Sequence, residues 1–572
     1  MQSDNPVARD LERATTVGRG NRVLSFFRAT VAPFIQDRRW LCLMLVCAGI
    51  WTAELFYMQH RTLVSVSELG GRFALFAPFG RLLLDLLFCF GLIFCLPRWM
   101  LFLTFPIATF CYLGLCTYAD YFEQPISVLT IFYQSNEGAL VSGFALQMIP
   151  TWPLRWFLLA LLVKLVLLFL VRRPKISWKA WSITALTFCG LFFAVTAFIN
   201  HHDPLDRILT KRGPGRLGIS RGYLGVWFAQ WWYLTDDAVL KDALIRKQQK
   251  SDRLQTEAYP EGDFPVGKHL VVIQCESLDW RLLEHVANGQ PVTPFLNELR
   301  SRSMVYRIEA LHHNGTADAD FGTLNGCPPS RHVITYNIPK YPYDDTLPQW
   351  VRPFGFQCRA LHGYHGNFYN RRYAFKKMGF DELIFQEECE GVYSLKPSTM
   401  GILDRDLLRV SANLLKKDDA ANVHAFQFII SLSTHGPFDM IAPEDRLIFP
   451  DHPTLAQNYL NSVRYLDGCL KQWYQDLPED TTVFLYGDNA ADVSEGDFHP
   501  DKQKTLVNGE EKLLEFVPCL IFTKGRDLSG CQISRDKPYA KSGELSLLDL
   551  VTYLRKQVKK SYAVPVGQVP GT

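Results

Sequence analysis

Hydrophobic residues are distributed unevenly along the chain, and long uninterrupted apolar runs are confined to residues 40–199. A helix needs about 20 mostly apolar residues to cross the hydrocarbon core of a bilayer, and five runs approach that length. A soluble core rarely contains so many runs in such a short stretch. The pattern therefore predicts a transmembrane domain over residues 40–200 with five spans, at Trp40–Met58, Phe73–Leu96, Met100–Tyr118, Trp156–Val171 and Trp178–Ile199.

Lys and Arg residues predict the orientation of these spans, because positively charged loops tend to stay in the cytoplasm. Seven arginines precede the first span, Arg98 lies between the second and third, and three basic residues lie in 172–175. With five spans, all three segments fall on one side of the membrane. We therefore expect a basic cytoplasmic N-terminus over residues 1–39 and a multi-pass protein of the inner, or cell, membrane, with everything after His201 outside the cytoplasm.

Four ionisable residues interrupt the apolar runs, namely Glu54, Arg81, Asp85 and Lys164. Charge inside a bilayer is costly and often marks function. The alternative is structural pairing, since Arg81 and Asp85 are four residues apart and share one helix face. Residues 201–259 then mix tryptophan with arginine, which is typical of a membrane interface or of an arm packed against the next domain.

The pattern changes from about residue 260, where short apolar runs alternate with stretches of helical periodicity. This alternation predicts an extracytoplasmic α/β domain over residues 260–572, with a mostly parallel sheet covered on both faces. The predicted strands are His269–Gln274, Phe426–Leu432, Thr482–Tyr486 and Val517–Phe522, with helices between them such as Thr293–Arg302 and Leu403–Lys416.

Composition narrows the class of protein further. The chain has 572 residues, of which 48% are hydrophobic, and its length indicates more than one domain. Its net charge of +3 offers no basic field for nucleic acid. Its 14 cysteines show no spacing typical of a zinc site.

Polar residues follow three of the predicted strands directly. Glu276 follows the first strand, His435 follows the second, and Asp488 with Asn489 follows the third. Binding sites of α/β sheets gather at the carboxyl ends of strands, so these side chains are expected at one edge. Any one of them alone is most often a turn or a helix cap. Together, their oxygen-rich set favours a hard divalent metal, Mg²⁺ or Mn²⁺.

Two further segments carry candidate chemistry, and each has two interpretations. Thr316 precedes a helical stretch with acids in its first turn, so it is either an N-cap or a nucleophilic hydroxyl beside a phosphate site. Residues 362–372 concentrate aromatic rings and hydrogen-bond donors. They form either a surface turn or a loop that grips a phosphate and its head group.

The order of these elements resembles the lipoteichoic acid synthase family, within the alkaline phosphatase/sulfatase superfamily. The resemblance covers most of the chain: five spans, a linker and an outward-facing catalytic domain. Several spaced motifs in family order are far more specific than any one of them. The matching strings are VVIQCESL at 271–278, GTADADF at 315–321, HG at 362–363, FYNR at 368–371, STHGPF at 433–438 and YGD at 486–488.

The resemblance implies a role for each matching residue. Glu276, Thr316 and Asp488 match metal-binding positions, and Thr316 also matches the nucleophile. The substrate-site positions are matched by His362, Phe368, Tyr369, Arg371 and His435.

The resemblance also implies the reaction. A phosphoglycerol-type head group passes from a membrane phospholipid, such as phosphatidylglycerol, to a glycan or glycolipid outside the cytoplasm. Thr316 attacks phosphorus and carries the group as a phospho-threonine. Arg371 and a histidine stabilise the phosphate oxygens, and His435 or His362 protonates the leaving alkoxide. Metal chemistry of this kind suits Mn²⁺ or Mg²⁺, with Zn²⁺ as a further option.

Two positions depart from the family pattern. Asn489 stands where histidine is usual, so a neutral carbonyl replaces an imidazole ligand, and His499 lies ten residues further on as a possible substitute. Tyr369 stands where tryptophan is commoner. Three functions remain open alongside phosphoglycerol transfer: a phosphoethanolamine transferase, a sulfatase-like hydrolase, and a non-catalytic subunit that binds lipid or glycan.

Overall fold

The computed structural model describes residues 38–64, 73–122, 126, 128, 131, 149–170, 178–202, 222–223, 227, 240–248 and 264–562. The last range has gaps at 313–314, 331–332, 492, 508–509 and 532–543. Nearly all of the expected cytoplasmic segment 1–39, and most of the linker 201–259, lie outside the described residues. The chain divides into two compact units, residues 1–131 with 141–233 and residues 132–140 with 234–572.

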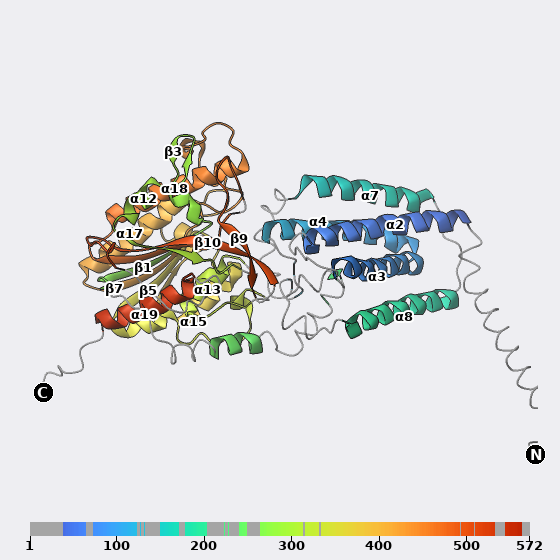
Figure 1. Cartoon of the computed structure of the whole chain (residues 1–572), viewed down its shortest axis with the longest axis horizontal. Helices are drawn as coiled ribbons and strands as arrows, with labels where there is room; N and C mark the ends of the chain where they lie inside the picture. Colours follow the sequence, from blue (N-terminus) through green and yellow to red (C-terminus); the bar gives the residue numbers. More distant parts are fainter. Residues whose placement is uncertain are drawn as a thin grey trace, which may run out of the picture. The chain divides into compact units, whose positions relative to one another are not determined.

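The first unit is helical, and its long helices coincide with the five predicted spans (Figure 1). Helix α2 packs against α3, α4 and α7, and α8 packs against α3. Four described segments are long and apolar enough to cross a membrane: Arg38–Thr62, Arg98–Ala119, Thr151–Leu170 and Trp181–Phe198. That α3 also crosses stays a prediction. The helices are α2 (Arg38–Gln59, continued by the π-helical turn η1, His60–Val64), α3 (Phe73–Cys95), α4 (Arg98–Phe122), α7 (Thr151–Leu170) and α8 (Trp178–His202).

The charged residues inside these helices lie against polar or aromatic partners. Lys164 of α7 forms an ion pair with Glu54 of α2, and both side chains are fully buried. Asp85 accepts a hydrogen bond from Gln59 Nε2 at 2.9 Å. The charges of Arg81 and Asp85 interact, as expected for residues four apart, but the Arg81 nitrogens make no hydrogen bond within the described residues, and the guanidinium lies 4.8 Å from the centre of the Phe56 ring.

The Glu54–Lys164 pair joins two helices and yields a test. Glu54→Gln or Lys164→Met alone leaves one buried charge unpaired, which costs about 3–5 kcal/mol. The double variant removes both charges, so we expect its thermal unfolding midpoint to lie above that of at least one single variant. Scanning fluorimetry of the full chain in detergent measures this. Arg155→Met, at an exposed position of the same helix, is the control, and additive losses in the double variant would contradict the pairing.

The second unit is built on one eight-stranded sheet. Strands β1, β5, β6, β7 and β8 run parallel, and β10 is antiparallel to both β8 and β4. The order is β4-β10-β8-β1-β7-β5-β6, with β9 pairing on β10. The bounds are β1 His269–Cys275, β4 Met304–Glu309, β5 Phe356–His362, β6 Glu382–Ile384, β7 His424–Ile430, β8 Thr481–Gly487, β9 Lys502–Val507 and β10 Glu510–Thr523; β2 (Val286–Ala287) and β3 (Gln290–Pro291) form a separate hairpin.

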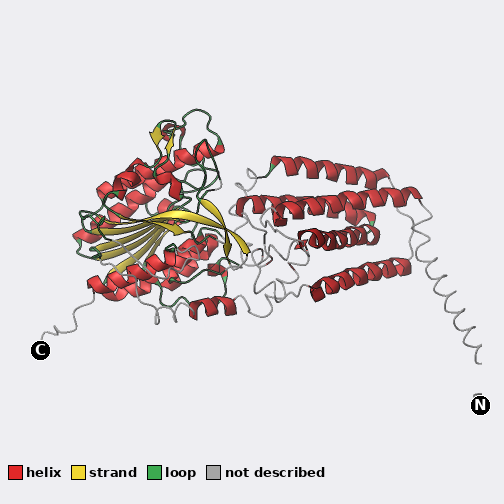
Figure 2. Cartoon of the chain, viewed as in Figure 1, coloured by secondary structure: helices red, strands yellow, loops and turns green. Residues whose placement is uncertain are grey.

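Helices cover both faces of this sheet (Figure 2). One layer contains α12 (Pro294–Arg300), α17 (Asp404–Ala420) and α18 (Leu455–Asp476). Helix α18 contacts both α12 and α17, and the three helices share a hydrophobic core with Val271 and Ile273 of β1. The other layer contains α13 (Ala317–Asn325), α14 (Leu347–Val351), α15 (Arg371–Met378) and α19 (Leu547–Tyr562). Shorter elements are α16 (Gln386–Gly391) and the turns η2 (Trp280–Leu283), η3 (Thr335–Asn337), η4 (Arg352–Phe354), η5 (Phe368–Asn370) and η6 (Pro443–Asp445).

The predicted fold class is confirmed: an apolar helical unit is followed by an α/β unit with a mostly parallel sheet. All four predicted strands exist within about two residues of their expected limits, except that Val517–Phe522 is the end of the much longer β10. The two example helices correspond to α12 and α17. The sequence pattern missed β4, β5, β6 and β9. The exact domain limits stay predictions.

Candidate active site

Four strands deliver polar side chains to the same edge of the sheet. Residues Cys275 of β1 and Gly487 of β8 are in register, so Glu276 and Asp488 follow neighbouring strands at the same level. His362 ends β5 opposite Ile430 of β7. The loop after β7 then carries His435. The structure thus brings together the residues that were expected to meet at the carboxyl edge.

Thr316 lies at the start of α13, and its hydroxyl does not cap the helix. It makes no side-chain hydrogen bond to the backbone of the first turn. Instead, Thr316 Oγ1 donates to Glu276 Oε2 at 3.0 Å, while its carbonyl accepts from Gln274 Nε2 at 3.2 Å. Of the two interpretations of Thr316, the geometry favours the hydroxyl held against a carboxylate. Thr316 as a residue is half-buried.

Asp488 and Asn489 both turn towards the chain that follows β1. The Ser277 N–H donates to Asp488 Oδ1 at 2.8 Å and to Asn489 Oδ1 at 3.1 Å. Ser277 adopts a positive φ of 53°, a conformation that a non-glycine residue rarely takes. A Cβ at Gly487 would lie 2.2 Å from the Leu278 carbonyl oxygen, so only glycine permits this close approach.

The carboxyl groups of Glu276 and Asp488 are buried close together. Burial raises the pKa of Asp488 well above its usual range, and the neighbouring Glu276 raises it further. Burial also raises the pKa of Glu276, against hydrogen bonds from Thr316 and Ser277 that lower it. Asp488 Oδ2 is buried and makes no hydrogen bond within the described part of the chain. Two facing carboxylates with an orphaned oxygen suit a divalent cation.

The donor set around these carboxylates contains oxygen atoms from carboxylate, hydroxyl and amide groups. No group of three or more His, Cys, Asp or Glu side chains in the described residues is arranged to hold a metal. Glu276, Asp488, Thr316 and Asn489 nevertheless converge around Ser277, and only the first two are acidic. Such a set fits a hard cation such as Mg²⁺ or Mn²⁺ better than a soft one.

Arg371 is the buried cation of the site. Its Nε donates to Asp320 Oδ2 at 2.7 Å, and the guanidinium lies 5.1 Å from the centre of the Tyr369 ring. Nη2 is buried and has no hydrogen-bond partner among the described residues. Tyr369 and Asn370, just before it, both adopt positive φ angles, which fixes the turn into α15. Arg371 is therefore held in place with one donor left for an anion.

His362 is buried and His435 is half-buried, and the charge of Arg371 acts on both rings. Burial and the charge of Arg371 hold the pKa of His362 well below its usual value, and the pKa of His435 is lowered by burial and by Arg371. Each ring places Nδ1 on a backbone carbonyl, Ile430 O at 3.1 Å and Gly436 O at 2.8 Å respectively. Because a carbonyl only accepts, Nδ1 carries the proton in each neutral ring, and Nε2 is the nitrogen without a hydrogen atom.

Aromatic rings line the loop between β5 and α15. The rings of Phe368 and Tyr369 lie with their centres 4.2 Å apart, and Phe368 also meets Tyr364 at 5.0 Å. Phe368 is half-buried, whereas the other two are buried. The loop is therefore a packed, ordered element, which favours the substrate-gripping interpretation over a simple surface turn.

Sequence reasoning missed Ser277 and Asp320 as members of this site. A serine after a strand and an acid in a helix carry no signal of their own, and only the fold shows that Asp320 holds Arg371. His499, the suggested substitute for the missing imidazole, is exposed, and its carbonyl accepts from Arg281 Nη1 at 3.2 Å. No described contact places it beside Asp488.

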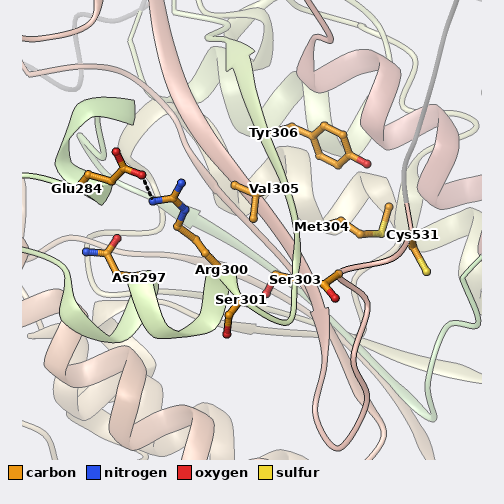
Figure 3. Close-up of a pocket in the computed structure, with 10 residues that line it drawn as sticks. Glu284, Asn297, Arg300, Ser301, Ser303, Met304, Val305, Tyr306 and Cys531 are labelled. Carbon is orange, nitrogen blue, oxygen red and sulfur yellow. Dashed lines mark hydrogen bonds and ion pairs between the residues drawn. The ribbon is translucent and has the colours of Figure 1, made fainter.

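A cavity of about 600 Å³ lies elsewhere in this unit (Figure 3). It is lined by residues at the start of β4, including Met304, and by Arg300 of α12 paired with Glu284. Because β4 runs in the same direction as β8, its first residues lie at the edge opposite the carboxyl ends. The cavity is thus remote from Thr316. The candidate active site is therefore identified by the chemistry of its side chains and not by the volume of a cavity.

Comparison with known proteins finds similarity to a named family and to named proteins. Residues 268–544 match the Sulfatase family. The lipoteichoic acid synthase of Staphylococcus saprophyticus is 23% identical over 415 residues, which cover 68% of this chain and 63% of that protein. Lipoteichoic acid synthase 2 of Bacillus subtilis is 22% identical over 479 residues, 78% of this chain and 70% of that protein. The match therefore spans just under two thirds of the staphylococcal relative.

Among solved structures, the integral membrane protein lipooligosaccharide phosphoethanolamine transferase A from Neisseria meningitidis has a TM-score of 0.50 at 13% identity. The superposition covers 85% of this chain and 88% of that one, so the two share a fold. Residues 268–544 form a sulfatase-family domain, and the chain that carries it is similar to lipoteichoic acid synthases.

Proposed function

We propose that this protein transfers a phosphoglycerol-type head group from a membrane phospholipid to a glycan or glycolipid outside the cytoplasm. The relatives named as synthases support a phosphate head-group transferase. The observation that carries the proposal is the Thr316 hydroxyl, which donates to Glu276 at 3.0 Å instead of capping its helix. Such an oriented hydroxyl beside a buried base is the arrangement of a nucleophile.

The first step transfers the head group to the protein. Thr316 Oγ1 attacks phosphorus, its proton passes towards Glu276, and the bond to the diacylglycerol oxygen breaks. A divalent cation bound by Glu276, Asp488, Thr316 and Asn489 would supply Lewis acidity and neutralise negative charge. Arg371 Nη2 donates to an equatorial phosphate oxygen. The leaving alkoxide takes a proton from an imidazole, His435 or His362, once the anionic substrate has favoured the protonated ring.

The second step returns the group to an acceptor. A sugar hydroxyl attacks the phospho-threonine, and the bond from phosphorus to Thr316 Oγ1 breaks. The proton of the sugar hydroxyl goes to a neutral imidazole, His362 or His435, and Thr316 Oγ1 takes back the proton that Glu276 received in the first step. The Phe368 and Tyr369 rings provide an apolar wall for the transferred group. The apolar helices of the first unit keep the protein in the membrane that contains the donor.

Asn489 favours the alternative of a non-catalytic subunit, because it replaces an expected imidazole. The ordered Thr316–Glu276 contact and the unpartnered donor of Arg371 argue for turnover instead. A phosphoethanolamine donor differs from a phosphoglycerol donor only in its head group, and the same mechanism serves both. The experiment below therefore compares the two donors.

The phospho-threonine is tested with purified full chain and lipids labelled in the head group, either phosphatidylglycerol or phosphatidylethanolamine. We expect intact-protein and peptide mass spectrometry to place a labelled phosphoglycerol adduct on Thr316, retained in Thr316→Ser and absent from Thr316→Ala. An adduct from phosphatidylethanolamine alone would change the donor, and an adduct on another residue would overturn the nucleophile.

Thr454→Ala is a matched control, because Thr454 is a true N-cap that accepts from Gln457 N at 3.2 Å. Loss of that cap costs about 0.5–2 kcal/mol, yet the adduct should still form. Thr316→Ala should instead lose the adduct while losing about 1 kcal/mol, the net worth of one hydrogen bond. Equal adduct levels in the two variants would mean that Thr316 has no chemical role.

The cation site is tested by removing metal at two pH values. Because the folded pKa of both Glu276 and Asp488 is raised, the metal-free protein keeps protons that the unfolded chain loses above about pH 4. The free energy of unfolding of the metal-free protein therefore falls as pH rises from about 4 through the raised folded-state pKa values. A bound cation offsets this loss. We expect a chelator to lower the unfolding midpoint strongly at about pH 7.5 and little at about pH 5.

The histidines with lowered pKa also destabilise the protein as pH falls. They do so with and without metal, so their effect cancels when the chelated and the metal-loaded samples are compared at one pH. Asp488→Asn removes one of the two facing charges. This variant should respond to the chelator at neither pH. A chelator effect that is equal at both pH values in the wild type would argue against a cation between the carboxylates.

A further inference from the structure

His312 lies on the chain segment that connects β4 to the nucleophile. The β4–β10 pairing continues past the end of β4, since Ala310 N donates to Glu515 O at 2.9 Å. The chain then passes to Gly315, whose φ of 111° turns it into Thr316 and α13. His312 is thus four residues before Thr316 in the sequence, and its side chain is one quarter exposed.

Glu515 links this histidine to the segment that contains Asp488. Its Oε2 accepts a hydrogen bond from Ala490 N at 3.0 Å and lies 3.8 Å from His312 Nδ1. Its other carboxylate oxygen lies 3.5 Å from Lys502 Nζ. Glu515 therefore fixes the backbone just after Asn489 and faces the Nδ1 side of the His312 ring, so Nε2 is the nitrogen left to act.

The contacts of His312 differ from those of the other two histidines of the site. His362 and His435 hold Nδ1 on the carbonyl oxygens of Ile430 and Gly436. The His312 ring instead faces Glu515, which binds the N–H of the second residue after Asp488.

Asn489 supplies an oxygen where the family motif supplies a histidine nitrogen. Its Oδ1 accepts from Ser277 N with one lone pair and keeps the other for a cation. A neutral amide oxygen donates less electron density to a cation than an imidazole does. The site therefore lacks a nitrogen donor from its own motif, while one stands on the neighbouring segment.

We propose that His312 supplies an imidazole ligand, through Nε2, to the divalent cation of this site, and that Glu515 orients the ring through Nδ1. A metal-bound histidine commonly passes its other N–H to a carboxylate, which fixes the tautomer and the ring direction. Closing the separation of 3.8 Å to a hydrogen bond needs a movement of about 1 Å. The proposal rests on the cation site of the proposed function and adds a ligand from outside the family motif.

The test uses Mn²⁺, the full chain in detergent, and two readouts other than turnover. Electron spin-echo envelope modulation of bound Mn²⁺ reports directly coordinated nitrogen, and equilibrium titration reports affinity. We expect a nitrogen coupling in the wild type that disappears in His312→Gln, together with a loss of affinity on the order of 10–100-fold. Glu515→Gln keeps an acceptor for Ala490 N, so it should retain the coupling and lose about tenfold in affinity.

His499→Gln is the matched control, because it makes the same substitution at an exposed histidine. It should change neither the coupling nor the affinity. A nitrogen coupling that persists in His312→Gln, or unchanged affinity in that variant, overturns the proposal while the cation site stands. If the wild type does not bind Mn²⁺, or binds it no more tightly than Asp488→Asn does, the cation site itself is overturned. The two failures are therefore distinguishable.

Discussion

Two buried carboxylates on adjacent strands set the conditions for the rest of the active site. Glu276 and Asp488 follow β1 and β8 at the same level, and Ser277 N ties them together through a strained backbone. Facing carboxylates in an apolar setting repel each other and are expensive to ionise. The register of β1 and β8 fixes the positions of both carboxylates. Their arrangement becomes favourable when a cation lies between them. Thr316 and the donors around Arg371 are arranged around that constraint.

Much of the fold followed from the sequence because strong patterns coincide with strong physical requirements. The spans and the central strands are continuous apolar runs. Nearly all residues of β1, β7 and β8 are buried in the core. The missed strands carry mixed patterns for specific reasons. β5 contains Arg359, whose charge is matched by Asp418 and Glu382, so a buried strand reads as polar. β4 is only partly buried and shows little alternation.

The site was predictable where it lies at strand ends, and unpredictable where it depends on tertiary contacts. Glu276, Asp488 and His435 could be anticipated because polar residues after buried strands meet at one edge. Thr316 could not be separated from an N-cap by sequence, since a cap and a nucleophile occupy the same local position. Asp320 acts through Arg371, which is 51 residues away, and His312 acts through Glu515, which is more than 200 residues away. A local sequence pattern contains no information on such distant pairs.

The charge balance of the site explains why a cation and an anionic substrate belong together. Arg371 is the buried positive charge, but Asp320 already neutralises it, and the two histidines beside it are neutral. Ionised Glu276 and Asp488 would leave the cleft with two negative charges, and a phosphodiester would add a third. Charges at such separations in a dry site repel by several kcal/mol. A divalent cation cancels the carboxylates, after which the open donor of Arg371 is free to select the phosphate. Binding of metal and of substrate should therefore be cooperative, as a consequence of where the strands place their last residues.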